Sequence, residues 1–161
     1  MSWKKAFLAQ ARSDYAVLQR LSNPPSEYCH RLHYLQMTTE KLAKAWLIGR
    51  DDEAPTPTHI AFSRMVQTLK MRPDVRRALR FVHTAAYKRF LNSLLELAVQ
   101  IEKLAPVSAG MEKPNPEYPW KDITSGTIVA PADFAFPDLD WKNPKMQKID
   151  ALIRHLLRIA S

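Results

Sequence analysis

The chain has 161 residues, 46% of them hydrophobic, and a formal net charge of +8. This length and apolar content suit one domain with a single buried core. No apolar run reaches the roughly 18 residues that a membrane span requires, and residues 1–5 lack the apolar core of a secretory signal. We therefore expect a soluble, cytoplasmic protein.

The balance of glycine, proline and cysteine indicates the fold class. Only 3 glycines stand against 12 prolines, and most prolines lie between apolar periodic stretches. This pattern predicts an all-α protein whose helices are separated by stiff connectors. The one cysteine, Cys29, has no partner for an internal disulfide and no metal-ligand spacing around it. We expect it to be a buried structural thiol.

Two antiparallel helices are predicted at the start of the chain. Over residues 3–21, apolar and amphipathic side chains recur in steps of four and three, and the prolines of 22–25 end this helix. Ser26 is then positioned to cap a second helix that continues to Gly49. Because the connection is short, the two helices should lie antiparallel.

Two further helices are predicted after an acidic, Pro/Thr-rich loop at 51–58. The spacing of Phe62, Met65, Val66 and Leu69 indicates a short third helix. Pro73 suits the first turn of the next helix. Its apolar strip predicts one long helix over 74–104, with a break near Thr84 as the alternative.

The remaining third of the chain is predicted to be a strap followed by a last helix. Residues 106–142 contain too many prolines for a long helix and too many aromatic residues for a disordered tail. We expect them to lie on the bundle in an irregular conformation, with a brief extended piece at 127–129. Asn143 and Pro144 then begin the last helix. The whole prediction is one domain over 1–161, an antiparallel bundle of about five helices.

The positive charge is concentrated in the helical half. Residues 1–104 hold 17 lysines and arginines against 9 acids, whereas the rest of the chain is balanced. Between 60 and 90 a single acid, Asp74, accompanies the basic residues Arg64, Lys70, Arg72, Arg76, Arg77, Arg80, Lys88 and Arg89. By charge alone, this stretch suits binding of a polyanion, a contact with an acidic protein, or an ordinary solvated surface.

Three motifs resemble the HEPN superfamily (higher eukaryotes and prokaryotes nucleotide-binding), a group of small helical bundles. The first helix carries Ala11, Asp14 and Tyr15, similar to the alanine-x-x-aspartate-aromatic opening of that family. The second helix resembles the family's glutamine-rich helix with a Glu-Lys pair, and residues 57–60 resemble its Thr-His entry into the third helix. The matching residues of the second helix are Gln36, Glu40, Lys41, Leu42, Lys44 and Ala45. The resemblance covers about residues 3–104.

The resemblance implies a candidate active site. Many HEPN proteins are ribonucleases that need no metal, and their signature is an arginine followed after four to six residues by a histidine. In this chain five residues separate Arg77 from His83, and six separate Arg76 from it. An imidazole can move a proton at a ribose 2′-hydroxyl or a leaving oxygen, while arginine holds the phosphate as negative charge develops.

Helix geometry refines the candidate catalytic set. On an unbroken helix, Arg76 and Arg80 share a face with His83, whereas Arg77 points away and is included through the resemblance. Tyr87, one turn further, matches an aromatic position that the family often has near its histidine. The residues predicted to bind nucleic acid around this set are Arg64, Lys70, Arg72, Tyr87, Lys88 and Arg89.

Partners follow from the resemblance as well. Family members commonly pair, so we expect a homodimer that brings two arginine-histidine helices around one cleft. The protein would then act on RNA as a toxin or defence nuclease, restrained by a partner such as a minimal nucleotidyltransferase. The alternatives are a binding module for nucleotide, RNA or an acidic protein, in which His83 is structural, and a purely structural subunit that docks through the strap.

The other polar candidates receive structural interpretations. Glu40 and Lys44, four residues apart, are predicted to form a weak exposed ion pair. His59 is expected to satisfy nearby backbone groups, and Asp14 is assigned no chemistry. His30 and His33 have no third ligand at a suitable spacing. We therefore expect neither a metal nor a cofactor.

Overall fold

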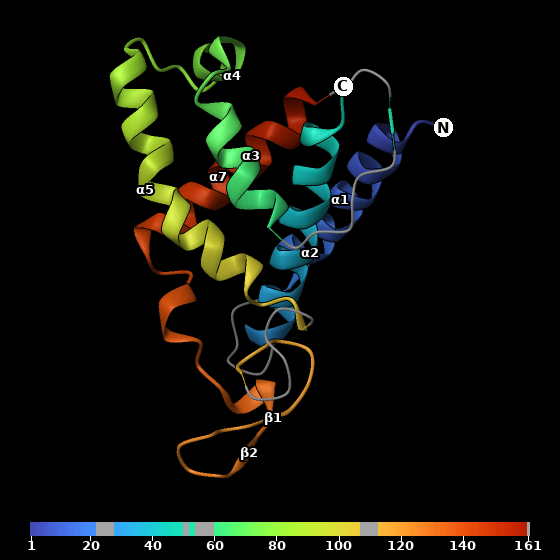
Figure 1. Cartoon of the computed structure of the whole chain (residues 1–161), viewed down its shortest axis with the longest axis vertical. Coiled ribbons are helices and arrows are strands. Elements are labelled where there is room, and N and C mark those ends of the chain that lie inside the picture. Colours follow the sequence, from blue (N-terminus) through green and yellow to red (C-terminus); the bar gives the residue numbers. More distant parts are fainter. Residues whose placement is uncertain (22–27, 50–51, 54–59, 107–112, 161) are drawn as a thin grey trace.

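The computed structural model describes residues 1–21, 28–49, 52–53, 60–106 and 113–160. Six helices pack together in this part of the chain, and a short hairpin with an aromatic cluster precedes the last helix (Figure 1). The expected all-α class and the expected strap are therefore confirmed. None of the helices in the described ranges is long and apolar enough to cross a membrane.

The first two helices form an antiparallel pair, as the short connection predicted (Figure 1). Helix α1 spans Trp3–Arg20, and its N-cap Ser2 accepts a hydrogen bond from the backbone N–H of Lys5. Helix α2 spans Tyr28–Leu47. The predicted cap at Ser26 lies outside the described residues. Cys29 is buried at the beginning of α2, which agrees with its expected role as a packed thiol.

Three helices complete the core. Helix α3 (Ala61–Leu69) packs against α2 and against α5 (Thr84–Glu102), and α7 (Pro144–Ile159) packs against α5. Asn143 caps α7 through its side-chain oxygen, which accepts from the N–H of Lys145, as the sequence predicted. Arg12 joins the first and last helices by donating to the carbonyls of Leu157 and Ala160 at the end of α7.

The long helix predicted over 74–104 is two helices. Helix α4 covers only Pro73–Ala78, and the chain turns over residues 79–83 before α5 begins. The aromatic packing explains the break, because the Phe81 ring contacts those of Tyr87 and Phe90 at centroid distances of 5.6 and 5.2 Å. On a straight helix, nine residues at about 100° each would place Phe81 and Phe90 on opposite sides. The alternative of a break near Thr84 is the correct one.

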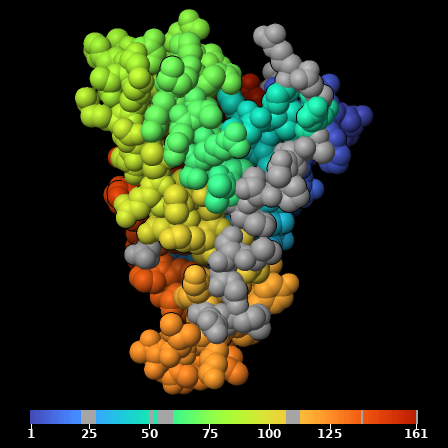
Figure 2. Space-filling model, in the orientation of Figure 1, coloured from blue at the N-terminus to red at the C-terminus, as the bar shows by residue number. Residues whose placement is uncertain are grey.

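The strap lies at the end of the molecule opposite α4, where its hairpin forms the narrow tip of the surface (Figure 2). Strand β1 (Trp120–Lys121) pairs antiparallel with β2 (Ile128–Val129), which confirms the extended piece expected there. Two 3-10 turns follow at Pro131–Asp133 and Pro137–Leu139. The Trp120 ring lies 5.1 Å from Phe134 and 6.2 Å from Phe136, so an aromatic cluster orders this segment.

Candidate nucleic-acid interface

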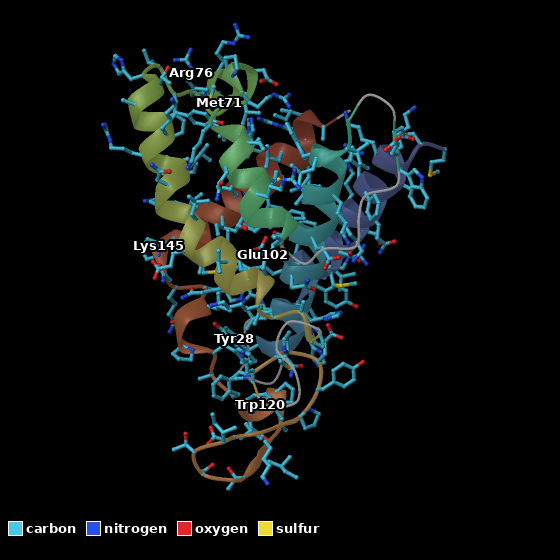
Figure 3. The ribbon with its side chains drawn as sticks, in the orientation of Figure 1. Tyr28, Met71, Arg76, Glu102, Trp120 and Lys145 are labelled. Carbon is cyan, nitrogen blue, oxygen red and sulfur yellow. The ribbon has the colours of Figure 1, made fainter. Side chains whose placement is uncertain are left out.

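Most of the basic residues singled out from the sequence gather at one end of the bundle, around α4 and the beginning of α5. Figure 3 shows nitrogen-tipped side chains, Arg76 among them, at this end, far from Trp120 in the strap. We call this region the basic end. It comprises Lys70, Arg72, Arg76, Arg77, Arg80, Lys88 and Arg89, together with His83 and the single acid Asp74. Arg64 lies earlier, on the exposed side of α3.

The turn after α4 is a Schellman motif that places an arginine where glycine is usual. The N–H of Phe81 donates to the carbonyl of Arg76 at 3.0 Å, and the N–H of Arg80 donates to the carbonyl of Arg77 at 2.9 Å. This 6→1 and 5→2 pair defines the motif. Arg80 is accordingly left-handed, with φ of 60°, a conformation that costs an L-residue about 1 kcal/mol or more.

Arg76 is tied to the start of the next helix. Its Nη1 donates to the carbonyl of Val82 at 2.9 Å and to the hydroxyl of Thr84, also at 2.9 Å. Because Val82 and Thr84 flank His83, Arg76 is held beside the histidine across the turn. The expectation that the two share one helix face is wrong, since the turn separates their helices.

His83 is the N-cap residue of α5, and its backbone carbonyl accepts the first helical hydrogen bond from Tyr87. Its side chain is exposed and does not cap the helix. Arg77 and Arg80 are not buried either, and within the described part of the chain none of these three side chains forms a hydrogen bond. The imidazole and the two guanidiniums are therefore accessible to solvent.

Tyr87 is a core residue. Its side chain is 1% exposed, and its hydroxyl donates to the carbonyl of Leu69 at 2.7 Å. Burial raises the pKa of Tyr87 to about 12, with a smaller contribution from the charge of Asp74. Its ring is thus covered, and it joins the end of α3 to the first turns of α5 rather than offering a face to a base.

Arg72 and Asp74 form a fork-to-fork ion pair at the beginning of α4. The Arg72 Nε and Nη2 lie 2.9 and 2.6 Å from the two carboxylate oxygens of Asp74. The hydrogen bonds from Arg72 lower the pKa of Asp74 to about 2. The Arg72 guanidinium also covers the Trp46 ring, 5.0 Å from its centroid. The only acid of the basic end is therefore already bound by one of its arginines.

A concave pocket of about 200 Å³ lies between the α3–α4 connection and the first turns of α5. Four cationic side chains line it, namely those of Lys70, Arg72, Arg76 and Lys88. Met71, Pro73, Thr84 and Tyr87 supply the remaining wall. Lys70, Arg72 and Lys88 were predicted to bind nucleic acid, and Arg76 to take part in catalysis. Arg77, Arg80 and His83 lie outside this pocket, and so does Arg89, on the exposed face of α5.

Sequence reasoning missed Thr84 and Pro73 as parts of this site. Thr84 was considered only as the point of an alternative helix break and not as a residue that contacts a ligand. A threonine two positions after a valine, as Thr84 is after Val82, occurs too often in sequences to mark the start of a helix. Pro73 was correctly expected in the first turn of a helix, but its place in a pocket wall depends on where α5 returns.

The motifs that carried the family resemblance form a polar layer between α1 and α2. The ammonium of Lys41 lies 3.2 Å from Asp14 Oδ2, and Gln10 donates to Asp14 Oδ1 at 2.8 Å. Asp14 is 6% exposed, so a residue that was assigned no chemistry is a buried, paired carboxylate. Pro57, Thr58 and His59 of the third motif lie outside the described residues.

The second half of the same layer contains the predicted Glu40–Lys44 pair. Lys44 Nζ lies 2.5 Å from Glu40 Oε1, and Gln36 donates to Glu40 Oε2 at 2.8 Å. The pair is formed as predicted, but both side chains are less than one-fifth exposed, so it is largely buried rather than exposed. Nearer the beginning of α2, His33 Nδ1 lies 3.1 Å from Glu117 Oε1 of the strap.

Comparison of the chain with protein-family models, with curated protein sequences and with solved structures found no match. The basic end is therefore interpreted from its own geometry and charge.

Proposed function

We propose that the basic end binds RNA through its phosphate backbone. The observation that carries this proposal is the gathering of seven lysines and arginines onto one end of the bundle, where the only acid, Asp74, is already paired with Arg72. Such a surface attracts a polyanion because binding releases the counterions that are condensed on the polyanion. The solvent-accessible side chains of Arg77, Arg80 and Arg89 can each reach a phosphate oxygen without disturbing the fold.

Binding is better supported than cleavage because of how Arg76 is used. Its Nη1 is already bonded to the Val82 carbonyl and the Thr84 hydroxyl. A catalytic arginine has to aim its donors at the phosphate oxygens where charge develops. Arg76 keeps only its other nitrogens for that purpose, and its fixed position suits holding a ground-state phosphate.

The test is fluorescence anisotropy with a labelled single-stranded oligouridine over a range of salt concentrations. The affinity should fall as the salt concentration rises. A plot of the logarithm of the association constant against the logarithm of the salt concentration should fall with a slope of about 0.7 for each phosphate bound on a single strand. The double variant Arg77→Gln/Arg89→Gln should lower this slope by about 1.4, because two phosphates are no longer neutralised. Lys121→Gln/Lys148→Gln removes the same charge from β1 and α7, and this control should bind as the wild type does.

Competition separates RNA from an acidic protein partner. When the two competitors are compared at equal concentration of negative charge, unlabelled RNA should displace the probe more effectively than polyglutamate. The reason is that closely spaced phosphates along the strand accept paired hydrogen bonds from arginine. If polyglutamate competes as well as RNA, or if the two double variants weaken binding equally, RNA is not the ligand of this surface.

Metal-independent RNA cleavage is the second candidate function, and the exposed ring of His83 favours it. The imidazole stands at the N-terminus of α5 with Arg77 and Arg80 before it in the chain, at the end of α4 and on the turn. Attack by a 2′-hydroxyl on the adjacent phosphorus would leave a cyclic phosphate and a free 5′-hydroxyl, with His83 moving the proton. A second copy of the chain, as the family resemblance implies, would supply arginines from the opposite side.

Incubation of a mixed-sequence RNA with an excess of chelator tests this second function. Cleavage by the wild type and a loss of at least about a hundredfold in His83→Ala is the expected result, since general acid–base catalysis contributes that much. The same variant should bind RNA with nearly unchanged affinity. Equal cleavage by both proteins, or intact RNA with both, rules out His83 as a catalytic residue and leaves the binding function.

A further inference from the structure

The pocket beside the first turn of α5 differs from the rest of the basic end because it is concave. Its volume of about 200 Å³ is lined by four cationic side chains that come from two segments, the α3–α4 region and α5. Arg77, Arg80 and Arg89 instead lie on the open surface around it. A phosphate in the middle of a strand can lie along an exposed surface, whereas a concave pocket favours a group at the end of a chain.

One of the four cations is already held in place before any ligand arrives. Arg76 reaches from α4 to the Val82 carbonyl and to the Thr84 hydroxyl, and these two hydrogen bonds of 2.9 Å fix its guanidinium at the pocket wall. Fixing a long side chain in advance removes most of the entropy that binding would otherwise cost. The pocket therefore has a preorganised positive centre, with Lys70 and Lys88 around it.

The start of α5 adds to the positive potential of this wall. Thr84, which lines the pocket, is the first residue of a 19-residue helix. The N-cap residue His83 gives no side-chain hydrogen bond to the first turn. The first backbone N–H groups of a helix have no partner within it, and the helix dipole places positive potential there. Four side-chain cations and this helix end therefore act on the same small volume.

The charge of the pocket matches a dianion better than a monoanion. Lys70, Arg72, Arg76 and Lys88 stand against a single carboxylate, that of Asp74. A phosphodiester within a strand carries one negative charge and two free oxygens. A terminal phosphate carries nearly two charges near neutral pH and three acceptor oxygens. The terminal group satisfies more donors in the pocket and neutralises more of its charge.

We infer that this pocket holds the terminal phosphate of the RNA strand that the basic end binds. The inference rests on the proposed function and adds a specificity to it: the protein distinguishes phosphorylated strand ends from hydroxyl ends. Arg76 contacts the phosphate from its fixed position, and Lys70 and Lys88 close on it from either side. The arginines outside the pocket bind the phosphates that follow along the strand.

Three oligouridines of one length test the inference, one with a 5′-phosphate, one with a 3′-phosphate and one with hydroxyls at both ends, each labelled at an unphosphorylated position. The wild-type protein should bind one of the phosphorylated strands about fivefold more tightly than the hydroxyl strand, as expected for one added charge-assisted contact of moderate strength. Lys70→Gln/Lys88→Gln should reduce this ratio to about 1. Because both lysines belong to the basic end, the variant should also bind the hydroxyl strand more weakly than the wild type does, so the ratio between the strands is the readout. Lys121→Gln/Lys148→Gln should keep the ratio of the wild type.

Inorganic phosphate distinguishes a strand end from a free anion. Inorganic phosphate should compete for the pocket and abolish the preference for the phosphorylated strand. Sulfate at equal ionic strength is the control for general screening, and the comparison is made at concentrations where the hydroxyl strand stays bound in sulfate. The two lysine substitutions lie on exposed or half-exposed side chains, and unfolding curves establish that the variant proteins are folded.

Each way in which the inference can fail has its own result. Equal binding of all three strands by the wild type overturns the inference and leaves the proposed function intact. A preference that persists unchanged in Lys70→Gln/Lys88→Gln also overturns it, because the end would then be recognised elsewhere. Absence of binding to any strand overturns the proposed function together with the inference.

Discussion

The Nη1 atom of Arg76, on α4, donates a hydrogen bond of 2.9 Å to the hydroxyl of Thr84, the first residue of α5. The same nitrogen donates to the carbonyl of Val82. Through these two contacts one guanidinium fixes the angle between two helices and forms part of a pocket wall. The stability of the turn and the shape of the candidate site therefore depend on the same side chain.

Replacement of the Thr84 hydroxyl should weaken the turn while its shape is kept. Thr84→Val preserves the outline of the side chain but removes the acceptor, and we expect the free energy of unfolding to fall by about 0.5–1 kcal/mol, as for one partly exposed hydrogen bond. Urea unfolding followed by circular dichroism measures the change. Thr124→Val, at an exposed position in the hairpin turn, should leave stability unaltered. A similar loss in both variants would show that the Arg76 contact contributes nothing.

Arg80 and Arg77 should respond to glycine with opposite signs. Arg80 has a φ of 60°, so Arg80→Gly relieves strain, and the gain outweighs the added flexibility of the unfolded chain by about 0.5 kcal/mol. Arg77 lies within α4, where glycine costs about 1 kcal/mol. Thermal or urea unfolding of the two variants tests this contrast.

The same two substitutions also separate charge from conformation. Each variant loses one cation of the basic end, so each should bind RNA more weakly by a similar factor despite the difference in stability. A destabilised Arg80→Gly protein would contradict the left-handed conformation of this residue. Weaker binding only in the less stable variant would mean that charge at these positions is unimportant.

Tyr87 is expected to make folding sensitive to alkaline pH. Its folded pKa is raised to about 12 from the ordinary value of 10.0, so the stability it contributes is complete below pH 10 and is lost as the pH rises through about 12. Tyr87→Phe should lower the free energy of unfolding by about 1 kcal/mol at pH 7, since it removes the hydrogen bond to Leu69. It should also flatten the decline in stability that the wild type shows above about pH 10.

Tyr28 provides the comparison for this measurement. Burial raises its pKa to about 12 as well, but its hydroxyl is buried without a hydrogen-bond partner in the described residues. Tyr28→Phe should therefore flatten the alkaline decline in the same way and lose no stability at pH 7. A loss at pH 7 as large as that of Tyr87→Phe would argue against the Tyr87–Leu69 hydrogen bond as its cause.

Glu102 is a buried acid that caps a helix from outside it. The side chain, at the end of α5, is 7% exposed, and its Oε1 accepts from the N–H of Ser63 in the first turn of α3 at 2.7 Å. Burial raises its pKa above the ordinary value of 4.5, partly opposed by hydrogen bonds from the start of α3. The neutral form is therefore favoured in the fold, and its stability contribution is complete below pH 4.5 and is lost as the pH rises through the folded pKa.

Two substitutions at Glu102 separate its charge from its capping role. Glu102→Gln keeps an acceptor for Ser63 and removes the buried charge, so it should be at least as stable as the wild type at pH 7, and this advantage should vanish by about pH 4. Glu102→Ala removes the acceptor and should cost about 1 kcal/mol or more. Unfolding curves at the two pH values measure both effects. A Gln variant that is less stable at pH 7 than at pH 4, relative to wild type, would contradict the raised pKa of Glu102.

The local signals in the sequence were reliable where one element decides the outcome. Asn143 followed by Pro144 starts a helix because the amide oxygen can accept from a first-turn N–H and the proline needs no hydrogen bond there. The apolar spacing of Phe62, Met65, Val66 and Leu69 gives a buried face in α3 for the same local reason. These choices depend only on neighbouring residues, so they can be made from a pattern.

The candidate site was predicted as a group of residues but not as an arrangement. The density of positive charge between 60 and 90 is a property of the sequence, and all of the basic residues in this stretch except Arg64 lie at the basic end. The helix-face argument for Arg76 and His83 failed because the chain bends at Arg80 and packs the Phe81 ring against that of Phe90. No local pattern contains the free energy of that contact, since it depends on where α5 returns after the turn.

The sequence by itself determined the helical class, the start of most helices, the aromatic strap and the charge available to a ligand. Each of these follows from backbone propensity, capping or composition, which act over a few residues. Only the tertiary structure decided which cations share a pocket, that Tyr87 is covered, and that Asp14 and Glu40 are paired in a buried layer. These outcomes depend on packing between segments distant in the chain, where burial of apolar surface selects one arrangement among many that the local preferences allow.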